Sequence, residues 1–190
     1  LFLSSLATFT CFELHDYKHF VYLTVVVSVL ALNRPDLKSK VIDSPEILSV
    51  VDNIPHIGVF LKSLYDCNYK AFMESIVDLH AGFVQNQFLS AHVDFVLREC
   101  RVLAYKQFLQ SYKSVTLANM AASFGYSEGF LDQELSRFIA ADRLSARIDK
   151  VGGIVETCRP DTKNGQYQDV IKKGDHLLNR IQKLSRVIST

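Results

Sequence analysis

The chain has 190 residues, a length that fits one domain or two small ones. Its 21 basic and 20 acidic side chains give a formal net charge of +1, which argues against a protein that binds nucleic-acid backbones through a large basic excess. Hydrophobic residues make up 48%, and this share excludes disorder along the whole length. Glycine and proline together number 12 (8 and 4), about half the usual share, so we expect long elements, few turns and a mainly α fold.

Neither the cysteines nor the most apolar segment indicates a secreted or membrane protein. The four cysteines are scattered and form no CxxC pair, a pattern typical of free thiols in a reducing compartment. The uncharged run Phe20–Leu32 has 13 residues, whereas a membrane-spanning helix needs about 20. We therefore expect this run to form a helix that is buried within a helical stack.

The first 112 residues predict a series of helices. Because the chain begins at Leu1, inside an apolar stretch, we expect a fragment of a longer polypeptide. Asp16 can cap a helix that runs to about Leu32. Ser44-Pro45-Glu46 combines a hydroxyl cap, a proline in the first turn and an acid near the helix N-terminus, so a short helix follows it. A further helix is expected over about 56–65.

Two longer helices are predicted next. Apolar residues recur at helical spacing from Tyr69 and again from His92. Two helices of about 20 residues joined near Leu89-Ser90 predict an antiparallel hairpin. Stacked hairpins are typical of helical repeats, so we assign 1–112 to the helical-repeat part of a domain.

The pattern changes after this region and predicts a winged helix over 113–160. Thr116 can cap a short helix that ends at Gly125, and Ser127 can cap a second helix. Alternating residues then flank Gly152-Gly153, which predicts a β-hairpin. Helix, turn, helix and hairpin within about 45 residues are the plan of a winged helix.

The predicted hairpin supplies the first candidate interface. Alternation along 144–149 and 154–158 predicts a buried face that includes Leu144, Ala146, Ile148 and Ile154. It also predicts a free sheet edge at Arg147, which can pair with a neighbouring subunit. We therefore take Arg147, Ile148 and Ile154 as candidate protein-interface residues.

The last 30 residues, 161–190, predict a linker and a long C-terminal bundle helix. Lys163-Asn164-Gly165 is expected to be the linker, and the helix is expected to begin at about Gln166. Its heptad seam, with steps of three and four residues, is a second candidate protein interface. The seam comprises Tyr167, Val170, Gly174, Leu177, Ile181, Leu184 and Ile188.

Catalytic, metal and cofactor motifs are not evident in the sequence. His15 and His19 are four residues apart, but no third zinc ligand is indicated, and we expect no metal. His80 lies on a predicted apolar stripe and is expected to be a hydrogen-bonded core histidine. No phosphate-binding glycine loop or GxSxG motif occurs. We expect no enzyme activity and no cofactor.

The charge of the predicted winged helix bears on nucleic acid. Between Ser114 and Pro160 there are five basic and six acidic residues, a net charge of −1. Acids at Glu128, Asp132 and Glu134 come before the first arginine of the second helix and would repel phosphates. We expect the module to bind proteins, and no nucleic acid partner.

Several long strings resemble a known family. The run from Tyr112 to Leu144 is similar to a PCI domain, a helical-repeat and winged-helix module of large scaffold complexes. The strings at 134–144, 148–161 and 171–188 resemble lid subunits of the 26S proteasome regulatory particle. SPEILSVV at 44–51 and SLYDCNYKAF at 63–72 fit the same group, so the resemblance covers nearly the whole chain. Gly152-Gly153 and Gly165 depart from typical members.

The resemblance implies a non-catalytic scaffold that assembles with other PCI-domain lid subunits in a hetero-oligomer serving ubiquitin-dependent protein degradation. It also implies a cytoplasmic and nuclear protein without a membrane anchor. The alternative is the PCI module of a translation-initiation or signalosome complex, with contact to nucleic acid.

Overall fold

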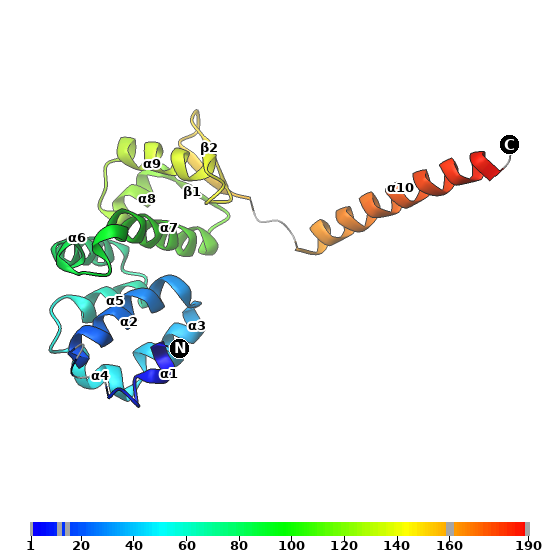
Figure 1. Ribbon diagram of the computed structural model, residues 1–190. Helices are drawn as coiled ribbons and strands as arrows, with labels where there is room; N and C mark the ends of the chain where they lie inside the picture. Colours follow the sequence, from blue (N-terminus) through cyan, green and yellow to red (C-terminus); the bar gives the residue numbers. More distant parts are fainter. Residues whose placement is uncertain (1, 11–12, 14–15, 159–161, 189–190) are drawn as a thin grey trace. The chain divides into compact units, whose positions relative to one another are not determined.

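The computed structural model describes residues 2–10, 13, 16–158 and 162–188, with side chains given except at 162–166, 169 and 186–188. The chain divides into two compact units, Leu1–Thr157 and Cys158–Thr190. Each unit is described by itself. Figure 1 shows the elements coloured along the sequence.

The first unit begins with a series of helices. These are α1 (Phe2–Ser5), α2 (Tyr17–Ala31), α3 (Arg34–Leu37), the π-helical turn η1 (Lys38–Ile42), α4 (Pro45–Val51), α5 (Ile57–Tyr65), α6 (Tyr69–Gln85), the 3-10 turn η2 (Ser90–His92) and α7 (Val93–Ser111). It continues with β1 (Ser114–Thr116), α8 (Leu117–Phe124), α9 (Glu128–Ala140), β2 (Ala146–Asp149) and β3 (Ile154–Thr157). The second unit holds α10 (Thr162–Ile188).

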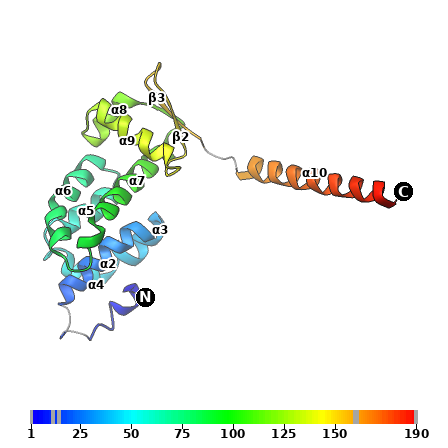
Figure 2. The same ribbon diagram turned by 45° about the horizontal axis from the view of Figure 1, so that its top comes forward.

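The mainly α fold, ending in a small sheet and a long helix, confirms the predicted fold class. In Figures 1 and 2, α6 and α7 lie between the earlier helices and the elements from α8 to β3. The helices expected near 16–32, 56–65 and 69–85 are present as α2, α5 and α6. The hairpin-repeat character of 1–112 and the exact domain boundaries remain predictions.

The helix start at Ser44 was predicted correctly, but its chemistry differs. Pro45 occupies the first turn of α4, as expected. The Ser44 hydroxyl makes no cap to the backbone and instead donates to Oε2 of Glu46 at 2.6 Å. This bond lowers the pKa of the Glu46 carboxyl.

A cluster of stacked aromatic rings joins the long helices to the sheet region. Tyr69 of α6 stacks on Phe124 of α8, with ring centroids 4.9 Å apart. Phe124 also meets Tyr105 and Phe108 of α7 edge-on, at 4.9 and 5.5 Å. Because Phe124 is almost fully buried, α8 is fixed to α6 and α7 by packing.

The apolar run at 20–32 packs inside the first unit. Val21, Val25 and Val29 of α2 are completely buried, which confirms the expectation of a helix within a stack. Among the described residues, no helix has both the length and the apolar character needed to cross a membrane.

The winged helix is built on a three-stranded antiparallel sheet with the order β1-β3-β2. The predicted hairpin is confirmed, because Ile148 pairs with Val155 and Arg147 with Glu156. β1 was not predicted. It pairs with β3 through Val115 opposite Val155 and is extended by a bond from the Leu117 amide to the Gly153 carbonyl, 2.8 Å.

The predicted buried face of the hairpin needs one correction. Leu144 and Ala146 are buried and Ile148 is half-buried, as expected. Residues directly opposite in an antiparallel pair point to the same face, so Val155 and not Ile154 completes this face. Ile154 pairs with Asp149 and lies half-buried on the outer face. The hairpin register, which alternation alone does not set, decides this assignment.

The linker expected at 163–165 was also wrong, because α10 begins at Thr162 and includes it. One glycine and one asparagine each lower helix stability by about 1 kcal/mol or less. Extending an existing helix needs no new nucleation, so the long helix continues through them.

Candidate protein-interaction surfaces

The C-terminal helix α10 presents a large apolar face. Taken by itself, it leaves Tyr167, Val170, Leu177, Ile181 and Leu184 between 53% and 67% exposed. Steps of three and four residues place these side chains along one side of a helix. Ile188 ends the helix, and its side chain lies outside the described residues. The helix thus brings the described members of the predicted seam into one line.

Two further apolar residues belong to this face and were not in the predicted seam. Ile171 and Leu178 are 55% and 58% exposed, and they are seven residues apart. Each lies four residues after one seam position and three residues before the next, which places both beside the seam. Their spacing of seven was the signal that could have identified them.

The winged helix offers a second surface, but its three candidate residues do not share one face. Arg147 is exposed on β2, an edge strand of the described sheet. Its side chain and that of Ile154 lie on the outer face, whereas Ile148 lies on the inner face. A partner could therefore bind the edge of β2 or the outer face of the sheet. Ile148 belongs to neither, because it lies on the inner face.

The wing, the turn between β2 and β3, is tied to α9. Nζ of Lys150 lies 3.4 Å from Oδ2 of Asp132. Val151 at the tip is completely exposed. Gly153 has a φ of +60°, which favours glycine at this turn. The tip thus carries an apolar side chain beside a paired lysine.

A buried polar cluster connects α7 to α9. Glu134 of α9 is only 7% exposed. It accepts a hydrogen bond from the Tyr105 hydroxyl and pairs with Nη1 of Arg101 at 2.8 Å. Burial first, and then the bond to the Glu134 carboxylate, raise the pKa of Tyr105. The carboxylate therefore holds the winged helix on α7.

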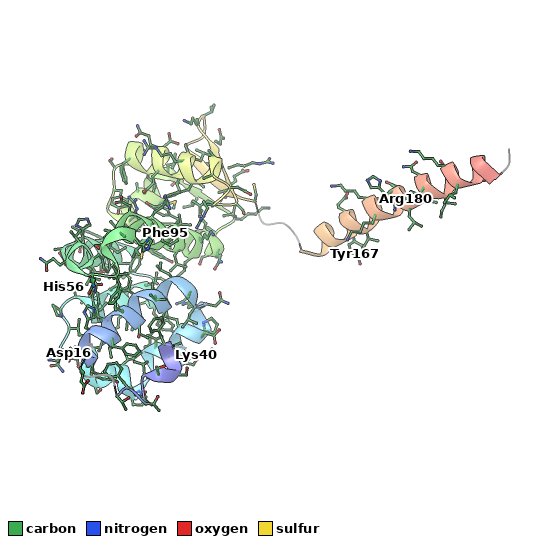
Figure 3. All side chains as sticks on the ribbon, in the orientation of Figure 1. Asp16, Lys40, His56, Phe95, Tyr167 and Arg180 are labelled. Atoms are coloured by element: carbon green, nitrogen blue, oxygen red, sulfur yellow. The ribbon has the colours of Figure 1, made fainter. Side chains whose placement is uncertain are left out.

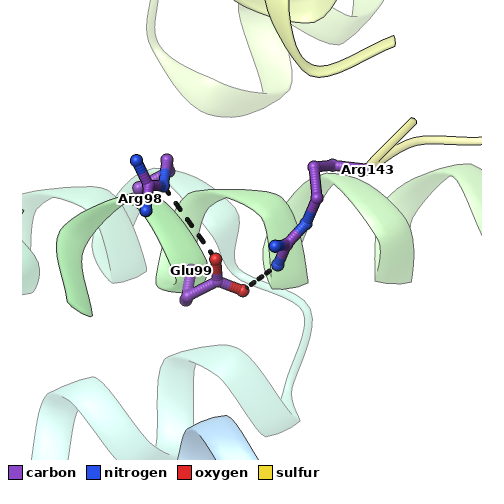
Figure 4. A network of polar contacts seen from close by, with 3 residues as sticks. All are labelled: Arg98, Glu99 and Arg143. Atoms are coloured by element: carbon purple, nitrogen blue, oxygen red, sulfur yellow. Dashed lines mark hydrogen bonds and ion pairs between the residues drawn. The ribbon is translucent and has the colours of Figure 1, made fainter. Parts of the chain in front are cut away.

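A second polar contact joins the same two parts at the surface. Glu99 of α7 lies between Arg98 and Arg143, as Figure 4 shows. It accepts a hydrogen bond from Nη2 of Arg143, while Nε of Arg98 is 4.0 Å away. Because Arg143 lies between α9 and β2, this contact fixes the entry to the hairpin.

The histidine predictions have different outcomes. His80 is exposed on α6 and not in the core, because Leu79 takes the buried position. His80 lines a hollow of about 330 Å³ that is otherwise bounded by Met73, Ile76, Val77, Leu97, Arg101 and Tyr126. His15 lies outside the described residues, and His19 contacts Nδ2 of Asn86 at 3.3 Å. Within the described part, no group of three or more metal-ligating side chains occurs.

Comparison with known proteins gives two family matches that coincide with the two surfaces. The PCI-domain model matches residues 76–159, from α6 to the end of the hairpin. A model described as the 26S proteasome regulatory subunit RPN7/PSMD6 C-terminal helix matches residues 166–188 of α10.

Individual relatives agree with these matches. A 26S proteasome non-ATPase regulatory subunit 6 homolog from Arabidopsis thaliana is 53% identical over 188 residues, covering 99% of this chain and 49% of the relative. The subunit 6 of Oryza sativa subsp. japonica is 52% identical over 188 residues, with 99% and 48% covered. The chain belongs to the PCI-domain family of 26S proteasome regulatory subunit 6. It spans about half the length of the curated relatives it matches.

A relative outside the proteasome is much more distant. COP9 signalosome complex subunit 1 of Arabidopsis thaliana is 27% identical over 148 residues, covering 78% of this chain and 34% of the relative. Membership of the proteasome subunit 6 family, and not of the signalosome, confirms the predicted resemblance.

Figure 3 shows the side chains of Tyr167 and Arg180 projecting from α10. These comparisons test none of the predicted interface residues. The interface roles of Arg147, Ile148, Ile154 and the α10 seam therefore stay predictions.

Proposed function

We propose that this chain is part of a non-catalytic scaffold subunit in the lid of the proteasome regulatory particle. It joins other PCI-domain subunits in a hetero-oligomer and so supports ubiquitin-dependent degradation without chemistry of its own. The observation that carries the proposal is the apolar face of α10, in a chain of the subunit 6 family. A helix with such a face needs a partner surface.

The energetics of α10 fit an anchoring role. Complete burial of a large aliphatic side chain is worth about 1.5–3 kcal/mol, so burying the exposed half is worth roughly 1 kcal/mol. Ile171, Leu177, Leu178, Ile181 and Leu184 are all about half exposed. Together they offer roughly 5 kcal/mol of gross burial before ordering costs, a substantial part of what docking into a helical bundle requires.

The described polar groups support a role without catalysis. Glu134, the one carboxylate among the buried polar residues of the described chain, is bonded to Tyr105 and Arg101. Burial raises the pKa of the Cys100 thiol to about 12, which leaves it a poor nucleophile. These groups stabilise packing and are not arranged around a substrate site.

The winged helix supplies a second contact under this proposal. The edge of β2 carries backbone groups that can pair with a strand of a neighbouring module. We place the protein in the cytoplasm and nucleus. Membership of the proteasome subunit family and the free thiols, which are typical of reducing compartments, support this placement.

A double substitution in the full-length protein tests the proposal. Leu177→Asp with Leu184→Asp puts two charges on the α10 face, where a bundle would have to bury them. We expect the melting temperature of the isolated protein to stay within about 2 °C, because both residues are exposed. Incorporation into the lid, measured by native gel and mass spectrometry of reconstituted particles, should fail.

The matched control makes the same change of net charge on the polar side of α10. Lys172→Gln with Asn179→Asp should leave both the melting temperature and incorporation unchanged. Normal incorporation of the Leu177→Asp/Leu184→Asp protein would reject the anchoring role. Unfolding of the isolated protein would instead assign α10 to the core of its own subunit.

A further inference from the structure

The two borders of the apolar face of α10 differ in charge. One border carries Lys173 and Arg180, seven residues apart. Each precedes a leucine of the seam by four residues, so both cations lie directly beside Leu177 and Leu184. The other border carries Gln168, Asp175 and Gln182, again at intervals of seven. The face is therefore flanked by cations on one side only.

The positive charges of α10 outnumber its acids. Residues 166–188 contain five basic and two acidic residues, a net charge of +3. Arg180 has no carboxylate three or four residues away in either direction, where a helical ion pair would form. Lys173 has Asp169 four residues before it, where a helical ion pair can form, and the Asp169 side chain lies outside the described residues. Arg180 makes no ion pair with any residue whose side chain is described. The charge of Arg180, and the net charge of +3, are thus available to a neighbour.

The width of the apolar face indicates two neighbours. In a two-stranded coiled coil, charged residues border the seam on both sides. Here Ile171 and Leu178 widen the face on the side away from the cations. The helix can therefore bury its wide apolar side against one neighbour and present the cationic border to another.

We propose that the helix packed on the Lys173–Arg180 border belongs to a partner subunit and presents aspartate or glutamate side chains to these two cations. The inference rests on the proposed function, since it names the chemistry of one partner of the α10 face. The long stems of lysine and arginine would cover the edge of the leucine seam while their charged ends meet carboxylates.

Such pairing would select the partner and its register more than it would add affinity. Apolar burial is similar for any hydrophobic helix, whereas a like charge at the border excludes the wrong neighbour. An acidic partner would align with two cations spaced by two turns of helix. The asymmetry of the borders then sets which side of α10 each neighbour occupies.

The test uses the full-length protein and lid particles reconstituted from the remaining subunits. Lys173→Glu with Arg180→Glu reverses the charge of the border. The control, Lys172→Glu with Lys183→Glu, makes the same change of net charge on the side opposite the apolar face. Incorporation is titrated at low and physiological salt. We expect the border variant to bind about tenfold more weakly or worse, and the control within about twofold of the natural protein.

A neutral variant separates attraction from repulsion. Lys173→Gln with Arg180→Gln should fall between the natural and the reversed protein, and its affinity should depend less on salt. Equal losses for the border variant and the control, or no loss for the border variant, would overturn the acidic partner.

The Leu177→Asp/Leu184→Asp protein distinguishes the two proposals. If it fails to incorporate while the border variant incorporates normally, only the acidic partner is rejected. If it incorporates normally, the anchoring role itself is rejected.

Discussion

Glu134 is a buried charged residue that links two helices of the first unit. Its carboxylate is buried between α7 and α9, where Tyr105 and Arg101 satisfy it. From the sequence it was one of three acids at the start of a helix, expected to repel phosphates. Burial could not be predicted there, because it depends on contacts with residues about 30 positions earlier in the chain.

A substitution at Glu134 tests the cluster. Glu134→Gln keeps the shape but removes the charge that compensates Arg101. Breaking a buried pair costs about 3–5 kcal/mol, and we expect about 2 kcal/mol because the Arg101 side chain is one-third exposed. Urea denaturation measures the loss. The control Glu156→Gln, exposed on β3, should change stability by at most about 0.5 kcal/mol. An equal loss of stability in the two variants would show that the buried Glu134 charge does not stabilise the packing of α9.

At the scale of elements, the sequence predicted the long helices well. It predicted poorly a short strand and a burial that depends on contacts distant in the chain. The apolar spacing located α5, α6 and α7 because their buried faces repeat over nine or more residues. β1 has three residues, too few for a period, and it exists because β3 offers an edge. His80 was misplaced because an apolar stripe can pass through Leu79 or His80 equally well until the neighbouring helices are known.

The turn between α8 and α9 gives a paired prediction on helix ends. Gly125 has a φ of +72°, and an added Cβ would lie 3.3 Å from Cγ of Lys70. Gly125→Ala should therefore destabilise by about 1 kcal/mol. Gly129 lies within α9 with nothing within 4 Å of an added Cβ, so Gly129→Ala should stabilise by about 0.5–1 kcal/mol. Thermal denaturation measures the melting temperatures of both variants. Changes of the same sign in the two variants would contradict this account.

The edge of β2 gives a second prediction for an element. The bonds from Thr157 to Lys113 and from Leu117 to Gly153 turn the backbone groups of Glu156 toward β2, so the Arg147 amide lies inside the β2–β3 ladder. Arg147→Pro would therefore disrupt the sheet itself, whereas Ala146→Pro removes a donor from the open edge, at the first residue of the strand, where proline is tolerated. If β2 pairs with a neighbouring subunit, Ala146→Pro should weaken lid incorporation more than it lowers the melting temperature. Arg147→Ala, which keeps every backbone donor, should do neither. Normal incorporation of a folded Ala146→Pro protein would exclude this edge from the interface.

At the scale of the whole molecule, the chain divides into two parts of opposite net charge. The winged helix has a net charge of −1 between Ser114 and Pro160, whereas residues 166–188 carry +3. The composition alone, with a net charge of +1, hides this division. The seam of α10 was predictable because one isolated helix needs no tertiary information. The surface that covers the seam was not predictable, because the pattern within one helix carries no information about its neighbour.

The winged-helix charge gives the last prediction. Glu128 lies in the first turn of α9, where a nucleic-acid-binding winged helix would contact phosphates, and Asp132 follows one turn later. Lys150 of the wing is already paired with Asp132, so its charge is not free for a phosphate. We expect no submicromolar complex with duplex DNA or RNA at physiological salt in fluorescence anisotropy. Glu128→Lys with Asp132→Lys, which changes the net charge by +4, serves as the positive control and should gain weak, salt-sensitive binding. Tight binding by the natural protein would overturn the assignment of this module to protein contacts, because phosphate attraction would then have to prevail against acids at the helix N-terminus.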